Sequence, residues 1–318
     1  MLMTGGGRRA GTISGGCLEA EVQKKAWWLT ETGPSLQRYS SFYDDDSDMP
    51  YGLGCGGTVS VLLERRETAD RILAALERSL NSRTGTVFVS VTESKSSESL
   101  GTRLILSEDG ETGLATLSSE IVALAHQALR EKRSLWQRGE TTLFAEYLPP
   151  RVALLVVGAG DDALPLVEFA GKLGWKTMVV DGRAHLATRE RFPAADEVFV
   201  LKAFDRFTLT DRDAAVLLTH SYEQDQAALR GLLPSDLGYL GVLGPRKRTE
   251  RLLSEIAPEL GMTPGDCLAR LHSPVGIDIG SKDPTSIALA ITAEIHEVME
   301  RPARRPSDKA DHPPAVHA

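Results

Sequence analysis

The sequence RVALLVVGAGDDALPLVEFAGKLGWKTMVVD, residues 151–181, decides the fold of the C-terminal half. Its first seven residues are almost all apolar, which is typical of a strand buried on both faces. A glycine turn follows, then a helical pattern to about Leu173, and then a second strand at 176–181. This order predicts a βαβ unit with two parallel strands.

The residues after this unit continue the alternation of strands and helices. Further strands are expected at 197–201, 214–219 and 239–243, and further helices at 222–232, 246–255 and 284–298. Such alternation predicts a doubly wound parallel sheet, so residues 150–300 are expected to form a Rossmann-like α/β domain. Residues 301–318 contain four prolines and little that is apolar, which predicts a disordered tail.

The N-terminal half contains an internal repeat, because residues 1–33 can be laid over residues 103–139. Each copy has a short apolar strand, a glycine turn, a second strand, a helix and a later strand. The second strands are expected at 10–13 and 114–117, the helices at 18–29 and 119–135, and the later strands at 58–63 and 142–147. We therefore expect a duplicated α+β domain at 1–149, with copies at about 1–66 and 86–149.

The two copies differ at their beginning. Residues 86–106 supply the second copy with a leading strand and a connector, and the first copy has no counterpart. The first strand is therefore expected to be missing, and an unpaired edge beside a buried strand is a liability. Either the start codon is assigned too late or another segment covers the edge, and we favour the late start.

Composition excludes several classes of protein. The chain has 318 residues, a net charge of −8 and 42% hydrophobic residues, which suits about two globular domains. The negative charge argues against nucleic acid or anionic lipid as a partner. Its three cysteines, Cys17, Cys55 and Cys267, form no CxxC pair, which argues against a disulfide framework or a zinc ribbon. With no signal-peptide core and no run of 18 apolar residues, we expect a cytoplasmic protein.

The glycine turn after the first parallel strand has the spacing of a dinucleotide-binding fingerprint. Gly158 and Gly160 open the turn, and Asp181 follows 23 positions after Gly158. However, Asp161 and Asp162 lie where a pyrophosphate would meet the helix N-terminus. We expect these acids to cap the helix and to repel an anion. The alternatives are an NAD(P) site and glycines that only permit close packing.

Basic residues follow two later strands. His220 comes directly after the strand expected at 214–219, where it would donate to a phosphate, contact a metal, or simply form a turn or cap. Arg246, Lys247 and Arg248 start a helix, and cations at a helix N-terminus oppose its dipole. An anionic ligand would explain them, and the alternative is a solvated basic face.

Two cysteines lie in glycine-rich segments of the N-terminal half. Cys17 follows two glycines at the start of a helix, which favours the thiolate. Cys55 lies between Gly54 and Gly56 in the loop GLGCGG, which leaves its sulfur uncovered. The second copy has neither cysteine, as expected if they serve a site instead of the fold. The alternative is that they are small buried apolar residues, which is what we expect of Cys267.

Two adjacent tryptophans lie in the helix expected at 18–29. Trp27 and Trp28 lie on an amphipathic helix, and we expect them to form a core or dimer contact.

Taken in order, these motifs resemble the XdhC/CoxI family from Gly11 to about Val298. The segments that carry the resemblance are GTISGGCLEAEV at 11–22, GLGCGG at 52–57, VVGAGDDA at 156–163, THSYE at 219–223, LGPRKR at 243–248 and SPVGIDIG at 273–280. Members are accessory proteins of molybdenum hydroxylases such as xanthine and carbon monoxide dehydrogenases. Two departures are the missing residues before the first glycine turn and Gly182, where the family often has proline.

The resemblance implies an N-terminal XdhC/CoxI domain, a C-terminal Rossmann domain and a chaperone instead of an enzyme. The implied function is to bind the molybdenum cofactor (molybdopterin), to support its sulfuration, and to deliver it to the large subunit of an apo-molybdenum hydroxylase. A cysteine desulfurase and a second copy of the chain are the other expected partners. The residues expected to bind the cofactor are Cys17, Gly54, Cys55, Gly56, Gly158, Gly160, Asp181, Arg183, His220, Arg246, Lys247 and Arg248.

Within this set, Cys55 and Cys17 are expected to contact molybdenum, because soft thiolates suit it. Arg183 and the basic cluster are expected to take the pterin phosphate. Two other functions remain open. One is an NAD(P)-dependent oxidoreductase, which requires tight nicotinamide binding, and the other is a scaffold that docks a hydroxylase without holding a cofactor.

Overall fold

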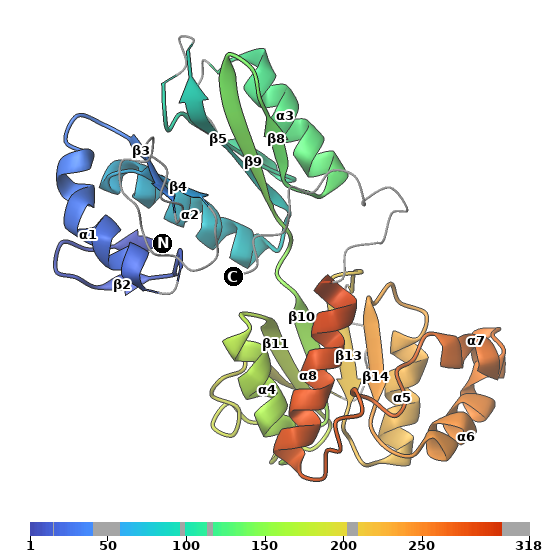
Figure 1. The fold of residues 1–318 in the computed structure, drawn as a ribbon. Helices are drawn as coiled ribbons and strands as arrows, with labels where there is room; N and C mark the ends of the chain where they lie inside the picture. Colours follow the sequence, from blue (N-terminus) through green and yellow to red (C-terminus); the bar gives the residue numbers. More distant parts are fainter. Residues whose placement is uncertain (15, 41–57, 96–98, 113–116, 202–208, 301–318) are drawn as a thin grey trace. The chain divides into compact units, whose positions relative to one another are not determined.

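The computed structural model describes residues 1–14, 16–40, 58–95, 99–112, 117–201 and 209–300. The chain divides into two compact units, which among the described residues are Met1–Pro150 and Arg151–Glu300. In Figure 1 the first unit runs from blue to green and the second from green to red. The predicted tail at 301–318 lies outside the described residues.

A five-stranded parallel sheet forms the centre of the C-terminal unit. Its strands are β10 (Ala153–Val157), β11 (Lys176–Asp181), β12 (Glu197–Val200), β13 (Asp213–Leu217) and β14 (Tyr239–Val242). They lie in the order β12-β11-β10-β13-β14, and all four pairings are parallel. Every residue of β10 and β13 is buried, which explains why both strands are apolar apart from Asp213 at the start of β13. The predicted Rossmann-like α/β fold is confirmed.

Helices cover both faces of this sheet (Figure 1). On one face lie α4 (Ala163–Lys172) and α8 (Pro284–Glu300), and on the other α5 (Tyr222–Leu232) and α6 (Arg246–Ile256). A 3-10 turn (Ala257–Leu260) and the short helix α7 (Pro264–Ala269) follow α6.

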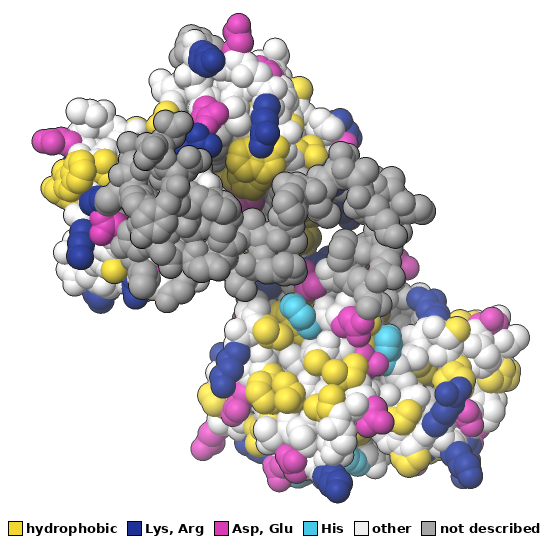
Figure 2. Space-filling model, viewed as in Figure 1, with side chains coloured by type: hydrophobic (Ala, Val, Ile, Leu, Met, Phe, Trp, Pro, Cys, Tyr) yellow, Lys and Arg dark blue, Asp and Glu magenta, His cyan; other side chains and the backbone are white. Residues whose placement is uncertain are grey.

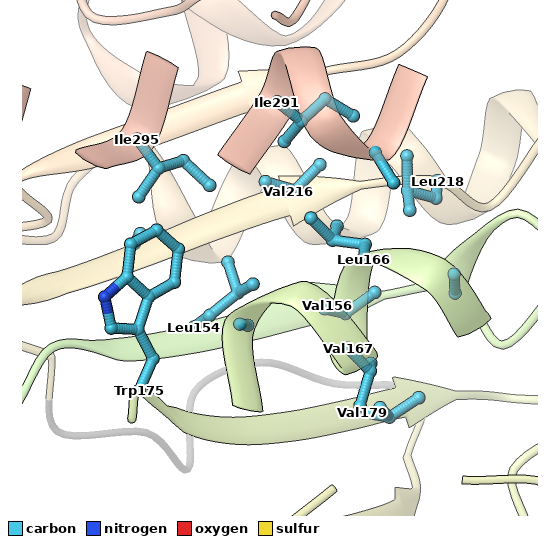
Figure 3. Close-up of a cluster of buried hydrophobic side chains, with 14 of the residues drawn as sticks. Leu154, Val156, Leu166, Val167, Trp175, Val179, Val216, Leu218, Ile291 and Ile295 are labelled. Carbon is cyan, nitrogen blue, oxygen red and sulfur yellow. The ribbon is translucent and has the colours of Figure 1, made fainter. Parts of the chain in front are cut away.

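The core under α4 and α8 shows how the helices are held. Leu154 and Val156 of β10 face Leu166 of α4 and Ile291 of α8 (Figure 3), and all four side chains are fully buried or within 1% of it. Burying one such side chain stabilises the fold by about 1.5–3 kcal/mol. The alternating side chains of β10 pack on α5 and α6, so the strand is apolar throughout.

The strand order creates a switch point between β10 and β13. From β10 the chain proceeds to β11 and β12 on one side, and then returns to β13 and β14 on the other. Ligands of open α/β sheets bind at the carboxyl ends of the strands beside such a point. The GAGDDA turn and His220 leave the sheet there.

The N-terminal unit begins with a small α+β part. It contains β1 (Leu2–Met3), β2 (Arg9–Ala10), α1 (Cys17–Leu29), β3 (Ser35–Ser40) and β4 (Thr58–Leu63). The first two strands pair with each other, and so do the last two. Leu18 and Val22 of α1 pack with Tyr39 and Leu63.

A larger part completes this unit. It contains α2 (Arg66–Ser82), β5 (Thr86–Ser94), β6 (Arg103–Ser107), β7 (Gly110–Thr112), α3 (Ser119–Glu131), β8 (Leu135–Gln137) and β9 (Thr141–Leu148). The strands form an antiparallel sheet in the order β7-β6-β5-β9-β8. Alternate residues Val87, Val89 and Val91 of β5 face α3, as the two-residue period of a strand requires.

Elements follow one another in the same order in both parts: β1-β2-α1-β3-β4 and β6-β7-α3-β8-β9. In the larger part β5 pairs with both β6 and β9. Among the described residues of the smaller part, no strand joins β1 to β4 in this way.

Two elements of the N-terminal unit end several residues earlier than predicted. The helix expected at 119–135 ends at Glu131, because Lys132 adopts a left-handed conformation (φ 50°) that stops it, and Leu135 begins β8. The strand expected at 10–13 ends at Ala10. The strand expected at 114–117 falls almost entirely outside the described residues, and β7 precedes it at Gly110–Thr112. Residues 113–116 lie outside the described part.

The tryptophan pair is not part of a core. The exposed fraction is 74% for Trp27 and 58% for Trp28, so the core interpretation is wrong, while the dimer contact stays a prediction. Figure 2 shows apolar side chains on the outside of α1. In the part of the chain that the structure describes, no helix is long and apolar enough to cross a membrane.

Candidate cofactor site

Gly158 shapes the turn that leaves β10. Its φ is +117°, and a Cβ atom there would lie 2.5 Å from the carbonyl oxygen of Leu218. Its N–H donates to Val180 (2.8 Å), and the Leu218 N–H donates to Val157 (2.7 Å). Only glycine lets the turn pack this closely against the end of β13.

Asp181, at the end of β11, is fully engaged by the protein. One carboxylate oxygen accepts from the N–H (2.8 Å) and Nε (2.9 Å) of Arg183, and the other accepts from Nη2 of Arg183 (2.7 Å) and the N–H of Ala159 (2.8 Å). Burial would raise the pKa of Asp181, but the hydrogen bonds from Arg183 and Ala159 lower it below its usual value. Asp181 therefore braces the glycine turn and holds Arg183.

The two acids of the turn contact side-chain nitrogen atoms from other segments. Asp161 binds Arg191 (2.6 Å), and Asp162 binds Nε2 of His220 (2.7 Å). Neither acid caps α4: Asp162 occupies the N-cap position without a capping side-chain hydrogen bond. The expectation of a capping role is wrong, because the carboxylate of Asp162 is drawn instead to His220 across the switch point.

His220 has an unusual backbone conformation. Its φ is 55°, in the left-handed region that few residues other than glycine adopt. Such strain is found at ligand sites and turns that the surrounding structure holds firmly. Its side chain is 65% exposed, so its contact with Asp162 leaves the imidazole accessible.

The three basic residues after β14 differ in whether a buried carboxylate already binds them. Arg248 binds Asp225 (2.5 Å), a carboxylate that is 1% exposed and also accepts from Thr219 (2.5 Å). Arg246 binds only the exposed Glu250 (3.0 Å), and no ion-pair partner of Lys247 occurs in the described ranges. No side chain caps α6 at Pro245. Arg246 and Lys247 are therefore the cations of this cluster that an anion can reach.

Sequence reasoning missed Glu294 of α8, which joins three segments. Its carboxylate accepts from the hydroxyl of Tyr239 (2.5 Å) and the N–H of Gly276 (2.7 Å), and contacts Nδ1 of His272 (3.1 Å). Burial, followed by the hydrogen bond to Glu294, raises the pKa of Tyr239. Glu294 thus ties the loop after His272 to β14 at the edge of the sheet. Its position on the buried side of an apolar helix was the available signal.

Glu19 of α1 was also missed. The carboxylate accepts from the N–H groups of Ile13 (2.8 Å), Ser14 (2.6 Å) and Gly16 (2.8 Å) and from the hydroxyl of Ser14 (3.1 Å). The hydrogen bond from the Ser14 N–H, with the others, lowers the pKa of Glu19 to about 2 although burial opposes it. Glu19 therefore fixes the segment before Cys17, and its place three residues after the N-cap Gly16 is the signal of a capping box.

The cysteines fall into different parts of the chain. Cys17 is the first residue of α1. Cys55, with Gly54 and Gly56, lies outside the described residues. Cys267 of α7 is fully buried, and burial raises the pKa of its thiol, which suits the structural role expected of it. Within the described ranges, no three His, Cys, Asp or Glu side chains are grouped as a metal ion would need.

The structure thus brings the predicted residues of the C-terminal unit to one edge of the sheet. They follow β10 (Gly158, Gly160), β11 (Asp181, Arg183), β13 (His220) and β14 (Arg246, Lys247, Arg248). The cysteine motifs belong to the N-terminal unit.

Comparisons with known proteins match both units. Residues 154–295 match the family model described as the XdhC Rossmann domain, and residues 1–40 match the XdhC and CoxI family. A Bacillus subtilis (strain 168) protein named as a probable xanthine dehydrogenase subunit is 32% identical over 313 residues, 95% of this chain and 88% of that protein.

Two further similarities extend over nearly the whole chain. The Escherichia coli (strain K12) molybdenum cofactor insertion chaperone PaoD is 25% identical over 301 residues, 94% of this chain and 77% of that protein. A crystal structure of a xanthine dehydrogenase from Bacillus halodurans superposes with a TM-score of 0.75 at 28% identity, covering 96% of this chain and 87% of that one.

Proposed function

This chain belongs to the XdhC and CoxI family, and from this premise we propose that it is a maturation factor for a molybdenum hydroxylase of the xanthine dehydrogenase type. It binds the molybdenum cofactor, supports its sulfuration and delivers it to the large subunit of the apo-enzyme. The observation that carries this proposal is the similarity, over 94% of the chain, to a protein named as a molybdenum cofactor insertion chaperone.

The phosphate end of the cofactor binds beside the N-terminus of α6. Arg183 and Arg248 are already held by the buried carboxylates of Asp181 and Asp225. Arg246 and Lys247 are accessible, and the uncapped helix start adds backbone N–H groups that attract anions. This division narrows the phosphate contacts to Arg246 and Lys247.

The cysteines of the N-terminal unit bind the molybdenum end of the cofactor. Thiolates are soft ligands that suit molybdenum and sulfide chemistry, and a thiol at the start of a helix ionises more readily. Cys55, assisted by Cys17, contacts the metal in this proposal. Glu19 supports it by holding the backbone that leads into Cys17.

The partners follow from the same proposal. The apo-hydroxylase receives the cofactor, a cysteine desulfurase supplies the sulfur, and two copies of the chain associate through the exposed Trp27 and Trp28 of α1 in the cytoplasm.

The test is retention of the cofactor by the full chain. The purified protein is incubated with molybdenum cofactor, free ligand is removed by gel filtration, and molybdenum and pterin are measured per chain. We expect near-stoichiometric retention of both. Cys55→Ala should lose molybdenum without loss of folding, whereas Cys267→Ala, which removes a buried thiol outside the motifs, should retain it. Equal retention by Cys55→Ala would contradict the role of this cysteine.

The phosphate contacts have their own control on the same helix. Arg246→Ala with Lys247→Ala should weaken pterin retention, whereas Arg251→Ala, 76% exposed and paired with Glu255, should not. Retention of neither molybdenum nor pterin by the unmodified chain would refute cofactor binding. Binding of an apo-hydroxylase in that case would instead support a docking scaffold.

A further inference from the structure

The carboxylate of Asp162 lies over the backbone of Gly160. A Cβ atom at Gly160 would be 2.6 Å from Oδ1 of Asp162. In dinucleotide-binding turns, the second glycine keeps this space free so that the pyrophosphate can approach the backbone. Here the space is filled by an anionic group of the protein itself.

His220 holds this carboxylate in place from the neighbouring strand end. Nε2 of His220 lies 2.7 Å from Oδ2 of Asp162, and the Asp162 side chain is only 18% exposed. Asp162 also places a negative charge at the N-terminus of α4, where the helix dipole favours an anion. The Asp162 side chain therefore occupies all three groups that would receive a pyrophosphate. These are the backbone of Gly160, the N-terminus of α4 and the imidazole of His220.

The surroundings offer no substitute contact for a nucleotide. Asp181, at the position that binds the ribose in dinucleotide sites, has both oxygens engaged by Arg183 and Ala159. The carboxylate of Asp162 contributes to raising the pKa of Arg183, after the larger effect of the Asp181 hydrogen bond. Arg183 is thus already paired with the buried carboxylate of Asp181.

We propose that Asp162, held by His220, occupies the pyrophosphate-binding position and closes the glycine turn after β10 to nucleoside diphosphates. The turn then cannot take the pyrophosphate that joins pterin and nucleoside in the dinucleotide form, and the α6 terminus takes one phosphate in the proposed function, so we expect the chain to take the form of the cofactor whose pterin ends in a single phosphate. This choice of form rests on the proposed function. The rejection of nucleoside diphosphates does not, because it concerns the geometry of the turn alone.

The first test is calorimetric titration of the full chain with ADP and with inorganic pyrophosphate. We expect the unmodified chain to show no more than weak binding of these anions at the accessible cations of α6. Asp162→Ala clears the space over Gly160 and should bind both ligands at least tenfold more tightly. Asp162→Asn keeps the shape and removes the charge, so its gain should be smaller. Circular dichroism and thermal unfolding establish that each variant is folded.

Asp161→Ala is the matched control. It removes a negative charge from the same turn, but its side chain is 92% exposed and does not cover Gly160, so ADP affinity should change little. Micromolar ADP binding by the unmodified chain would overturn the proposal. So would a folded Asp162→Ala variant that binds ADP no more tightly than Asp161→Ala.

A second test compares the two cofactor forms in the gel-filtration assay. Retention of the monophosphate form in preference to the dinucleotide form supports the choice, and the reverse preference overturns it. Retention of neither form refutes the proposed function and with it the choice of form, while the ADP titration still decides the role of Asp162.

Discussion

Replacing Glu294 by alanine should destabilise the C-terminal unit by about 2–4 kcal/mol. The change leaves two donors without their acceptor, the hydroxyl of Tyr239, which is 1% exposed, and the N–H of Gly276. It also removes the contact to His272. A buried donor left without an acceptor costs about 1–3 kcal/mol. Since His272 and Gly276 are partly exposed, water can replace part of the hydrogen bonding that they lose. The unpaired hydroxyl of Tyr239 therefore makes the largest contribution to the loss of unfolding free energy.

The assay is urea unfolding followed by tryptophan fluorescence. Trp175 is 4% exposed and is the one tryptophan of the C-terminal unit, whereas Trp27, Trp28 and Trp136 are 58–74% exposed. The blue-shifted emission of a buried indole therefore reports the unfolding of this unit. The midpoint and slope for Glu294→Ala give the loss in unfolding free energy.

Glu294→Gln is the control for this prediction. Its amide oxygen can accept from Tyr239 and Gly276, and its amide NH₂ can donate to Nδ1 of His272, so all three contacts survive. We expect a loss below about 1 kcal/mol. The reasoning fails if Glu294→Ala costs less than about 1 kcal/mol, or if Glu294→Gln is as damaging as Glu294→Ala.

Two other predictions concern single residues. The lowered pKa of Glu19 means that its stabilising effect is complete above about pH 4.5 and is lost as the pH falls towards 2. The stability of the N-terminal unit should therefore fall less steeply with acid in Glu19→Gln than in the unmodified chain. Equal slopes would contradict this. Gly158→Ala combines left-handed strain with a 2.5 Å clash and should cost about 2–5 kcal/mol in thermal unfolding. Gly174→Ala has a φ of +76° and open space, so it should cost only about 1–2 kcal/mol, and equal losses would argue against the clash.

The helices and strands of the C-terminal unit could be predicted because their patterns are local. The range Tyr222–Leu232 was predicted for α5 and observed, and so was Lys176–Asp181 for β11. In both, the sequence records which of the element's own side chains are buried. In the N-terminal unit α2 was not predicted, because it lies between the two copies of the repeat.

Helix ends proved harder than helix centres. The helical pattern continued past Glu131, but Lys132 turned left-handed and released Leu135 to pair with Ala145 in β9. Because Lys132 is not a glycine, the sequence gives no signal that it adopts a left-handed conformation. The strand that follows is fixed by its tertiary pairing with β9.

By itself, the sequence determined the Rossmann-like unit, the glycine turn and the family, because periodicity and motifs depend on neighbouring residues. Only the tertiary structure decided what the polar groups do. Asp162 meets His220, 58 positions away, because β10 and β13 are adjacent at the switch point, and Glu294 meets Tyr239 because α8 packs beside β14. The partner of a carboxylate depends on which strand ends and helices meet, and that order is fixed by the burial of the whole sheet, not by any one segment.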